Sequence, residues 1–326
     1  MKLTRRTLAV LTGALLGGLA ASASAQTKWD LPSAYPASNF HTENLAQFAK
    51  DVQAATGGKL TIQVHDNASL FKAPEIKRAV QGGQAQAGEF LMVNFQNEWP
   101  LWGLDGIPFL ATSYAESFKL YQASKATLQK KLAEQGMVLL YSVAWPPQGI
   151  FTKMQVNSAA DLKGIKWRAY SPATARIAEL VGAQPVTVQA AEFSQALATG
   201  VVESTMTSGA TGVDSKLYEH LKFYYDTQAW LPKNAVLVNK KAFDALDKPS
   251  QDALLKAGAD AEARGWASSA KVNTDTVAKL KANGMDVVTP PAALKADMAK
   301  VGDTMLKEWL DKAGPEGKAL IDAYRK

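Results

Sequence analysis

The residues of this chain best suited to chemistry surround one arginine, Arg168. It lies late in the segment Asp161–Tyr170, where Gly164 ends a short helical turn and residues 165–170 form a predicted strand. A guanidinium is a permanently charged, planar fork of donors that matches a carboxylate with two parallel hydrogen bonds. We therefore interpret Arg168 as the anchor for the anion of a small molecule. The alternative is an ordinary solvated arginine at the end of a strand.

Aromatic residues gather near this arginine, at a break in the regular pattern. Residues 144–149 contain two prolines and a glycine, which indicates that the chain crosses there between domains. This crossing is flanked by Trp145, Phe151, Trp167 and Tyr170. A cleft lined by aromatic rings and one fixed cation would suit a carboxylate with an apolar body, although such rings also fill ordinary cores.

Sequence motifs for metal binding or catalysis are absent. The chain has no cysteine, and its three histidines, His41, His65 and His220, lack the spacing of metal ligands. Glu89 and Glu203 could form a carboxylate pair, but no pattern in the sequence brings them together. We therefore predict no metal ligands and no cofactor and find no catalytic constellation, while the sequence leaves open whether a metal ion assists ligand binding.

The elements that must position these residues alternate between strands and helices. Strands are predicted at residues 27–33, 60–64 and 85–93, with helical patterns between them, and the second half of the chain repeats this rhythm. Such alternation predicts an α/β fold with crossover connections, here in two lobes. Ligands of such sheets bind beyond the carboxyl ends of the strands.

Three further helices are predicted in the second half of the chain. One covers residues 212–221, and another covers residues 294–313 near the end. The longest covers residues 250–282, which corresponds to roughly 50 Å of helix. Because this length exceeds one small lobe, we expect the helix to brace both lobes.

The first 25 residues are typical of an export signal peptide. The basic pair Arg5-Arg6 precedes an apolar run over residues 8–20, and the small residues up to Ala25 fit the cleavage rule. The arginine pair leaves the export route, general or twin-arginine, open. Cleavage removes three of 36 basic residues and none of 30 acidic ones, so the mature net charge is about 33 − 30 = +3. This charge is too small to predict nucleic-acid binding.

Four segments together resemble the solute-binding proteins of TRAP (tripartite ATP-independent periplasmic) transporters. They are Phe48–Val52, Asn157–Arg168, Val181–Pro185 and Ala196–Glu203. The resemblance covers essentially the whole mature chain and makes Arg168 the counterpart of the family's carboxylate-binding arginine. It implies two lobes joined by crossing hinge strands, with a long helix across both. It also implies a periplasmic receptor that closes on an organic acid and delivers it to a membrane permease.

The same resemblance implies further ligand contacts. Gln148 falls where many members place a second contact, often an arginine, and its neutral amide suits a carbonyl or hydroxyl beside the carboxylate. Thr207 falls in a loop that often contributes a ligand contact. Because Glu203-Ser204 replaces the usual Asp-Gly pair nearby, the direction in which the Thr207 side chain points stays open. Other pocket-lining segments of the family correspond to segments that contain Tyr35, Phe90 and Asn234.

Together these features predict a monomeric receptor whose ligand is a monocarboxylate with an aromatic or branched body, a 2-oxo or 2-hydroxy acid among the options. The rings of Phe90, Trp145 and Tyr170 would cover the apolar part of that ligand. The predicted lobes comprise residues 26–147 with 234–272, and residues 148–233 with 273–326. An exported enzyme acting on organic acids and a binding protein coupled to a membrane sensor are the alternatives.

Overall fold

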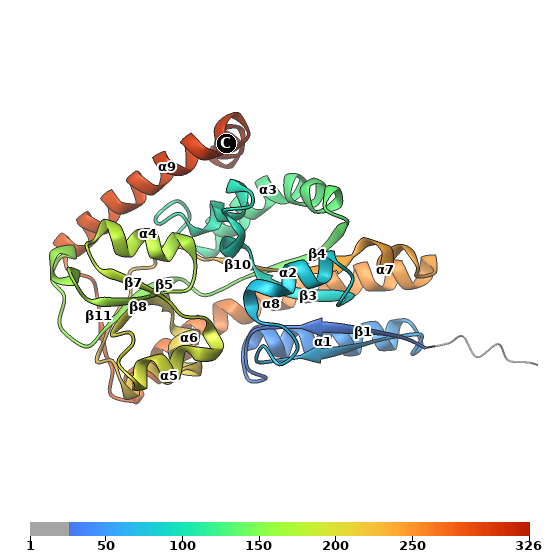
Figure 1. Ribbon diagram of the computed structural model, residues 1–326, viewed down its shortest axis with the longest axis horizontal. Coiled ribbons are helices and arrows are strands. Elements are labelled where there is room, and N and C mark those ends of the chain that lie inside the picture. Colours follow the sequence, from blue (N-terminus) through green and yellow to red (C-terminus); the bar gives the residue numbers. More distant parts are fainter. Residues whose placement is uncertain (1–25) are drawn as a thin grey trace, which may run out of the picture.

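The computed structural model describes residues 26–326 and has two lobes, each with its own β-structure (Figure 1). The predicted signal peptide, residues 1–25, lies outside the described residues. Helices and strands alternate along both lobes, as the sequence pattern predicts. The predicted class, a two-lobed α/β fold of the periplasmic binding protein type, is therefore confirmed.

The first lobe contains two small sheets. A parallel pair consists of β1 (Thr27–Pro32) and β2 (Leu60–His65). An antiparallel sheet places β10 (Lys233–Asn239) between β3 (Ala87–Leu91) and β4 (Met137–Ala144). The helices of this lobe are α1 (Phe40–Ala55), α2 (Ala73–Gln81), α3 (Tyr114–Glu134) and α7 (Lys240–Asp244). Because β10 follows β5 to β9 in the chain, the first lobe is built from segments on both sides of most of the second lobe.

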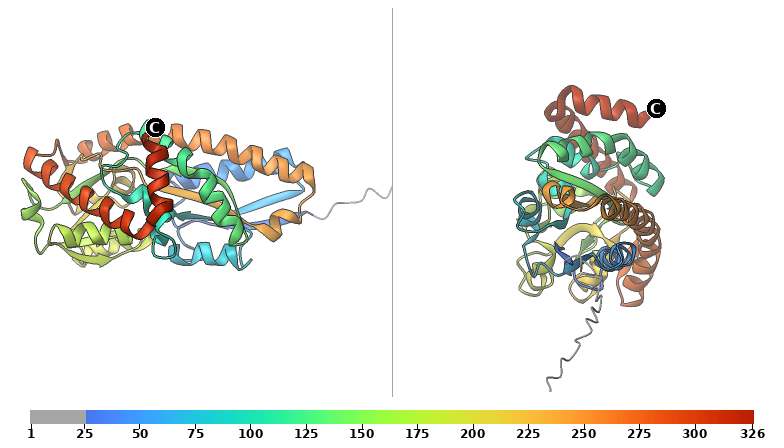
Figure 2. Two further views of the ribbon diagram at one scale, coloured as in Figure 1. Left: turned by 90° about the horizontal axis from the view of Figure 1, so that it is seen from above. Right: turned by 90° about the vertical axis from the view of Figure 1, so that its right-hand side faces the viewer.

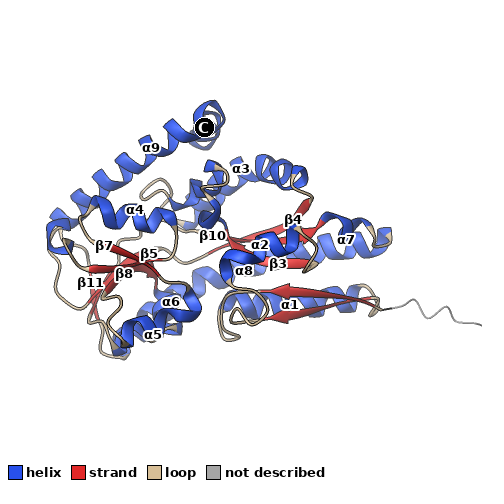
Figure 3. Cartoon of the chain, in the orientation of Figure 1, coloured by secondary structure: helices blue, strands red, loops and turns tan. Residues whose placement is uncertain are grey.

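The second lobe is built on one six-stranded sheet with the order β11-β9-β5-β8-β6-β7. In chain order the strands are β5 (Gln148–Thr152), β6 (Lys166–Ala169), β7 (Gln184–Thr187), β8 (Ser204–Ser208), β9 (Phe223–Tyr225) and β11 (Asp286–Val288). The helices are α4 (Pro172–Leu180), α5 (Phe193–Ala198) and α6 (Gly209–Asp214). Figure 3 shows α4 on one side of this sheet and α5 on the other.

Two segments cross between the lobes and are hydrogen-bonded to each other. The first joins β4 to β5, and the second joins β9 to β10. The backbone N–H of Trp145 donates to the carbonyl of Pro232 over 2.8 Å, and that of Gln148 donates to the carbonyl of Trp230 over 2.9 Å. These paired segments confirm the predicted crossing hinge strands. They also place Gln148 at the point where the chain enters the second lobe.

A single long helix, α8 (Lys248–Ala282), packs on both lobes. Asp247 caps its start, because its side chain accepts a hydrogen bond of 2.9 Å from the backbone N–H of Ser250. The helix lies against α1 and β4 of the first lobe and against α6 and β11 of the second (Figure 2). Its approach to β4 requires Gly265, where a Cβ atom would lie 2.4 Å from Cγ2 of Val143. The predicted brace across both lobes is confirmed.

The last helix, α9 (Ala292–Arg325), is longer than the prediction of residues 294–313 and is broken at Gly314 (φ 58°, ψ −145°). Before the break, residues such as Met298 pack into the core of the second lobe. After it, residues such as Ile321 pack into the core of the first lobe. Figure 2 shows the final turns lying at a steep angle to the first part of the helix. One helix therefore contacts both lobes.

The predicted helix over residues 212–221 is wrong in position. In the structure α6 starts earlier, because Ser208 caps it by accepting a hydrogen bond of 3.2 Å from the backbone N–H of Thr211. It ends before Lys216, whose left-handed backbone (φ 50°) interrupts the helical path. The helix meets the first lobe at its end, where Nδ2 of Asn39 donates a hydrogen bond of 2.6 Å to Oδ2 of Asp214.

Candidate functional site

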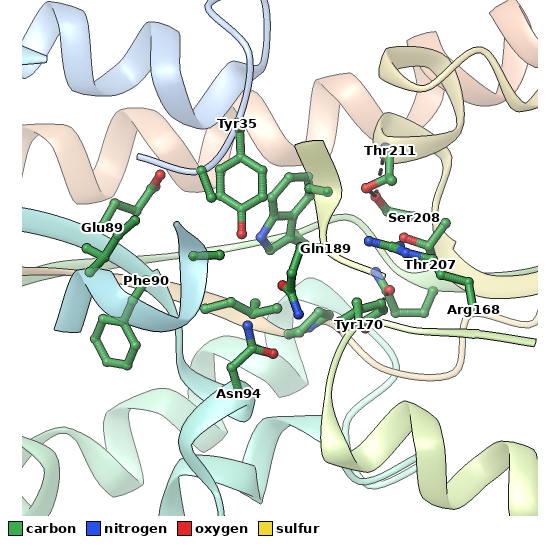
Figure 4. Close-up of a pocket in the computed structure, with 18 residues that line it drawn as sticks. Tyr35, Glu89, Phe90, Asn94, Arg168, Tyr170, Gln189, Thr207, Ser208 and Thr211 are labelled. Atoms are coloured by element: carbon green, nitrogen blue, oxygen red, sulfur yellow. Dashed lines mark hydrogen bonds between the residues drawn. The ribbon is translucent and has the colours of Figure 1, made fainter. Parts of the chain in front are cut away.

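A cavity lies between the two lobes, where β-strands of both lobes end. It contains about 590 Å³ of space free of protein atoms, part of which is open to solvent. Of the eight predicted contact residues, the ones that line it are Tyr35, Phe90, Trp145, Gln148, Arg168, Tyr170 and Thr207. Figure 4 shows several of these side chains around the cavity. The fold thus brings together residues that are far apart in the sequence.

Arg168 enters this cavity from strand β6 and is 2% exposed. Its Nε donates a hydrogen bond of 3.0 Å to the carbonyl of Val188, and its guanidinium stacks 4.1 Å from the ring centre of Phe193. Among the described residues, no carboxylate lies within ion-pair distance of this guanidinium. Burial lowers the pKa of Arg168 to about 10, so it remains charged near neutral pH. The structure therefore holds a buried cation that lacks a protein counter-ion.

Gln148 and Tyr170 lie beside Arg168 and are hydrogen-bonded to each other. The Tyr170 hydroxyl donates to Oε1 of Gln148 over 2.9 Å, and Nε2 of Gln148 donates to the carbonyl of Pro146 over 2.9 Å. One N–H of the Gln148 amide therefore stays available to a ligand. Thr207, which is 3% exposed, lies on the neighbouring strand β8, opposite Gly149. These groups provide neutral donors around the guanidinium.

The first lobe contributes an aromatic wall organised by Asn234. The Tyr35 hydroxyl donates to Oδ1 of Asn234 over 3.3 Å, and Nε1 of Trp145 donates to the same oxygen over 2.9 Å. The two rings pack edge to face with centroids 4.8 Å apart. Asn234 itself does not line the cavity, so its direct contact with a ligand stays a prediction, and its visible effect is to orient two rings.

Phe90 lines the cavity, but its ring packs into the core of the first lobe. Its centroid lies 5.0 Å from that of Phe95 and 5.5 Å from that of Trp102, with both pairs edge to face. Figure 4 shows the ring pointing away from Arg168. The part of Phe90 available to the cavity is therefore small, and its role as a cover for the ligand stays a prediction.

The cavity is also lined by Glu89, which was considered above only as a partner of Glu203, and by Asn94, Gln189 and Ser208, which were not among the eight predicted contacts. Glu89 is 2% exposed and is a charged residue inside an otherwise apolar strand, which is the signal that could have revealed it. The possible pair of Glu89 with Glu203 does not form, because Glu203 has an exposed side chain that faces Lys153 at 3.9 Å.

Residues 26–326 show neither a metal cluster nor a membrane-spanning helix. Within that range, no three histidine, cysteine or acidic side chains cluster in a way that could hold a metal ion. Over the same range, none of the helices has the length and apolar character needed to cross a bilayer. The chemistry of the cavity is therefore that of an arginine, neutral polar groups, one carboxylate and aromatic rings.

A family model described as bacterial extracellular solute-binding protein, family 7, matches residues 33–312. The chain belongs to this family. Its members include periplasmic receptors of TRAP transporters, so the resemblance found in the sequence is confirmed. The protein is accordingly a TRAP periplasmic solute receptor. A curated relative, the 2,3-diketo-L-gulonate-binding periplasmic protein YiaO of Escherichia coli, is 25% identical, with 99% of this chain and 98% of the relative covered.

Solved structures of similar receptors share the fold of this one closely. DctP6 of Bordetella pertussis, a receptor binding pyroglutamic acid, is 65% identical with a TM-score of 0.91, covering 92% of this chain and 99% of its own. DctP7 of the same organism, which also binds pyroglutamic acid, is 46% identical with a TM-score of 0.91, covering 92% and 100%. A marine metagenome TRAP receptor with co-purified pyroglutamate is 46% identical with the same TM-score, covering 92% and 99%.

Proposed function

We propose that this receptor binds pyroglutamate, or a closely related small cyclic monocarboxylate, between its lobes. The observation that carries the proposal is the buried Arg168 without a protein counter-ion, in a chain 65% identical to a receptor that binds pyroglutamic acid. A carboxylate bound bidentately would supply the missing negative charge. Pyroglutamate is a monocarboxylate, but its body is a five-membered lactam. The aromatic or branched body favoured from the sequence is therefore replaced by a polar ring.

In this proposal the ligand stabilises the closed arrangement of the lobes because it contacts both. Arg168 and Gln148 belong to the second lobe, whereas Tyr35 and Trp145 belong to the first. A ligand that touches only one lobe in the open form gains the second set of contacts on closure, which shifts the population toward the closed form. The free N–H of Gln148 is placed to donate to a ligand oxygen.

The remaining parts of the proposal concern location, partners and lobe boundaries. Proteins of this family are periplasmic, and we place this receptor there as a monomer, after removal of residues 1–25, with delivery of its ligand to a TRAP permease. The division into residues 26–147 with 234–272 and residues 148–233 with 273–326 also stays a proposal. The sheet to which each strand belongs supports this division. The end of α9 is the exception, because it packs on the first lobe although the division assigns it to the second.

The test is to identify and then re-bind the ligand. Protein purified from a host that contains pyroglutamate is denatured, and the small molecules released are identified by mass spectrometry. Calorimetry on refolded, ligand-free protein then compares L-pyroglutamate with a sugar acid of similar charge. Tight binding of L-pyroglutamate, recovered chemically unchanged after long incubation, is the expected result. Binding of the sugar acid alone, or chemical conversion of the ligand, would contradict the proposal.

A further inference from the structure

The cavity contains two charged side chains of opposite sign, one from each lobe. Arg168 comes from β6 of the second lobe and Glu89 from β3 of the first, and each is 2% exposed. Figure 4 shows them on opposite sides of the cavity. All the other described residues that line the cavity are formally neutral. The lining therefore carries no net charge but has a positive and a negative end.

Glu89 has two polar neighbours from the first lobe. The Ser33 hydroxyl donates to Oε2 over 2.8 Å, and Nδ1 of His41 lies 3.4 Å from Oε1. Nε2 of His41 is buried with no hydrogen-bond partner among the described residues. Over the same residues, no lysine or arginine lies within ion-pair distance of Glu89.

The carboxylate of Glu89 keeps the capacity to accept a hydrogen bond from a ligand. A carboxylate has about four lone-pair sites, and the hydrogen bond from Ser33 uses one of them. Tyr35 lies between the two charges. Burial raises the pKa of Tyr35 well above its usual value, the negative charge of Glu89 raises it further, and Arg168 opposes this shift. Tyr35 therefore stays protonated near neutral pH.

We propose that Glu89 determines the ligand class of this cavity by selecting monocarboxylates that carry an N–H donor and disfavouring dicarboxylates. This inference rests on the proposed function and adds a residue and a reason to it. An N–H bonded to a buried carboxylate is a charge-assisted hydrogen bond, which an isostere without the N–H cannot form. A second ligand carboxylate would meet a like charge in a poorly solvated site. The lactam of pyroglutamate satisfies both conditions.

The first experiment compares three ligands with the unaltered receptor by calorimetry. L-Pyroglutamate is compared with its γ-lactone analogue, in which oxygen replaces the ring N–H, and with glutarate, a dicarboxylate. The lactam should bind at least about tenfold more tightly than the lactone and about a hundredfold more tightly than glutarate. Affinities of lactam and lactone within about twofold of each other, or glutarate as the tightest ligand, would overturn the inference.

The second experiment uses the isosteric substitution Glu89→Gln, with Ser33→Ala as the matched control. Glu89→Gln removes the charge, so the preference for lactam over lactone should fall by about three- to tenfold and glutarate should gain at least about tenfold. Ser33→Ala removes a donor to Glu89 but keeps the charge, and it should preserve the order of the three ligands. Wild-type ratios in Glu89→Gln would refute the role of Glu89.

Thermal unfolding establishes whether both variants are folded. If Glu89→Gln does not fold, the comparison of the three ligands on the unaltered receptor still decides the inference.

The proposed function and the role of Glu89 fail in different ways. If the receptor binds none of the three acids, the proposed function is contradicted and the inference about Glu89 falls with it. If it binds all three without discrimination, only the role of Glu89 is overturned.

Discussion

Replacing Arg168 with methionine should weaken ligand binding strongly without lowering the stability of the ligand-free protein. The guanidinium can give two charge-assisted hydrogen bonds to a carboxylate, each worth about 1.5–3 kcal/mol. Methionine has a similar length but no donor, so both bonds are lost together. The affinity for pyroglutamate should therefore fall by at least about 100-fold.

The stability of the ligand-free protein should not fall in the same way. Burial lowers the pKa of Arg168 from 12.5 to about 10, and at ~1.4 kcal/mol per pKa unit this corresponds to a destabilisation of about 3 kcal/mol. For a base with a lowered pKa in the fold, this destabilisation is complete at neutral pH and disappears only as the pH rises from about 10 towards 12.5. Methionine removes this destabilisation. It also removes the hydrogen bond to Val188 and the stacking on Phe193, which together stabilise the fold by about 2 kcal/mol. The free energy of unfolding should thus be unchanged or rise by about 1 kcal/mol.

Two measurements and one control test this prediction. Calorimetry gives the affinity, and urea unfolding of the refolded, ligand-free protein gives the stability. Arg176→Met is the matched control, because Arg176 lies in the same lobe but outside the ligand cavity and forms a bidentate ion pair with Glu308. The control should keep its affinity. If Arg168→Met binds within about threefold of the unaltered protein, the assigned role of Arg168 is refuted.

Three further predictions concern other parts of the chain. Gln148→Glu introduces a carboxylate near Arg168 that can occupy the guanidinium in place of the ligand, so calorimetry should show affinity lower by about tenfold or more. Asp105→Ala leaves Lys233, 3% exposed, buried without its counter-charge, and urea unfolding should show a loss of about 3–5 kcal/mol. Asp247 has a pKa lowered to about 2 by its hydrogen bonds to Ser250, so its stabilisation is complete above pH 3.8 and is lost as the pH falls through about 2. Asp247→Asn should therefore melt at a lower temperature than the unaltered protein near neutral pH and at the same temperature below pH 2.

Much of the fold follows from local patterns in the sequence. Most helices and strands could be located from the spacing of hydrophobic residues and from the prolines and glycines at their ends. The predicted helix over residues 250–282, for example, matches α8 within two residues at its start. Strand β5 was missed because Pro146 and Pro147 precede it directly and hide its pattern. The second part of α9 was missed because Gly314-Pro315 looks like a helix end, although only contacts with the first lobe decide that a helix resumes there.

The site was predictable where a residue type carries its own chemistry. Arg168 was singled out because a guanidinium matches a carboxylate and because segment Asn157–Arg168 resembles the family's carboxylate-binding segment, and the fold places it in the cavity. Phe90 could not be distinguished from a core residue, since the direction of its ring depends on packing against Phe95 and Trp102. Glu89 was noticed as a carboxylate, but its place opposite Arg168 depends on how the lobes meet. No local pattern records that relationship.

The break at Gly314 has a mechanical consequence. The helix packs on the second lobe through Met298, and on the first lobe through Trp309 before the break and Ile321 after it, so it links the two lobes. Opening of the cavity therefore requires movement at α9 as well as at the two hinge segments.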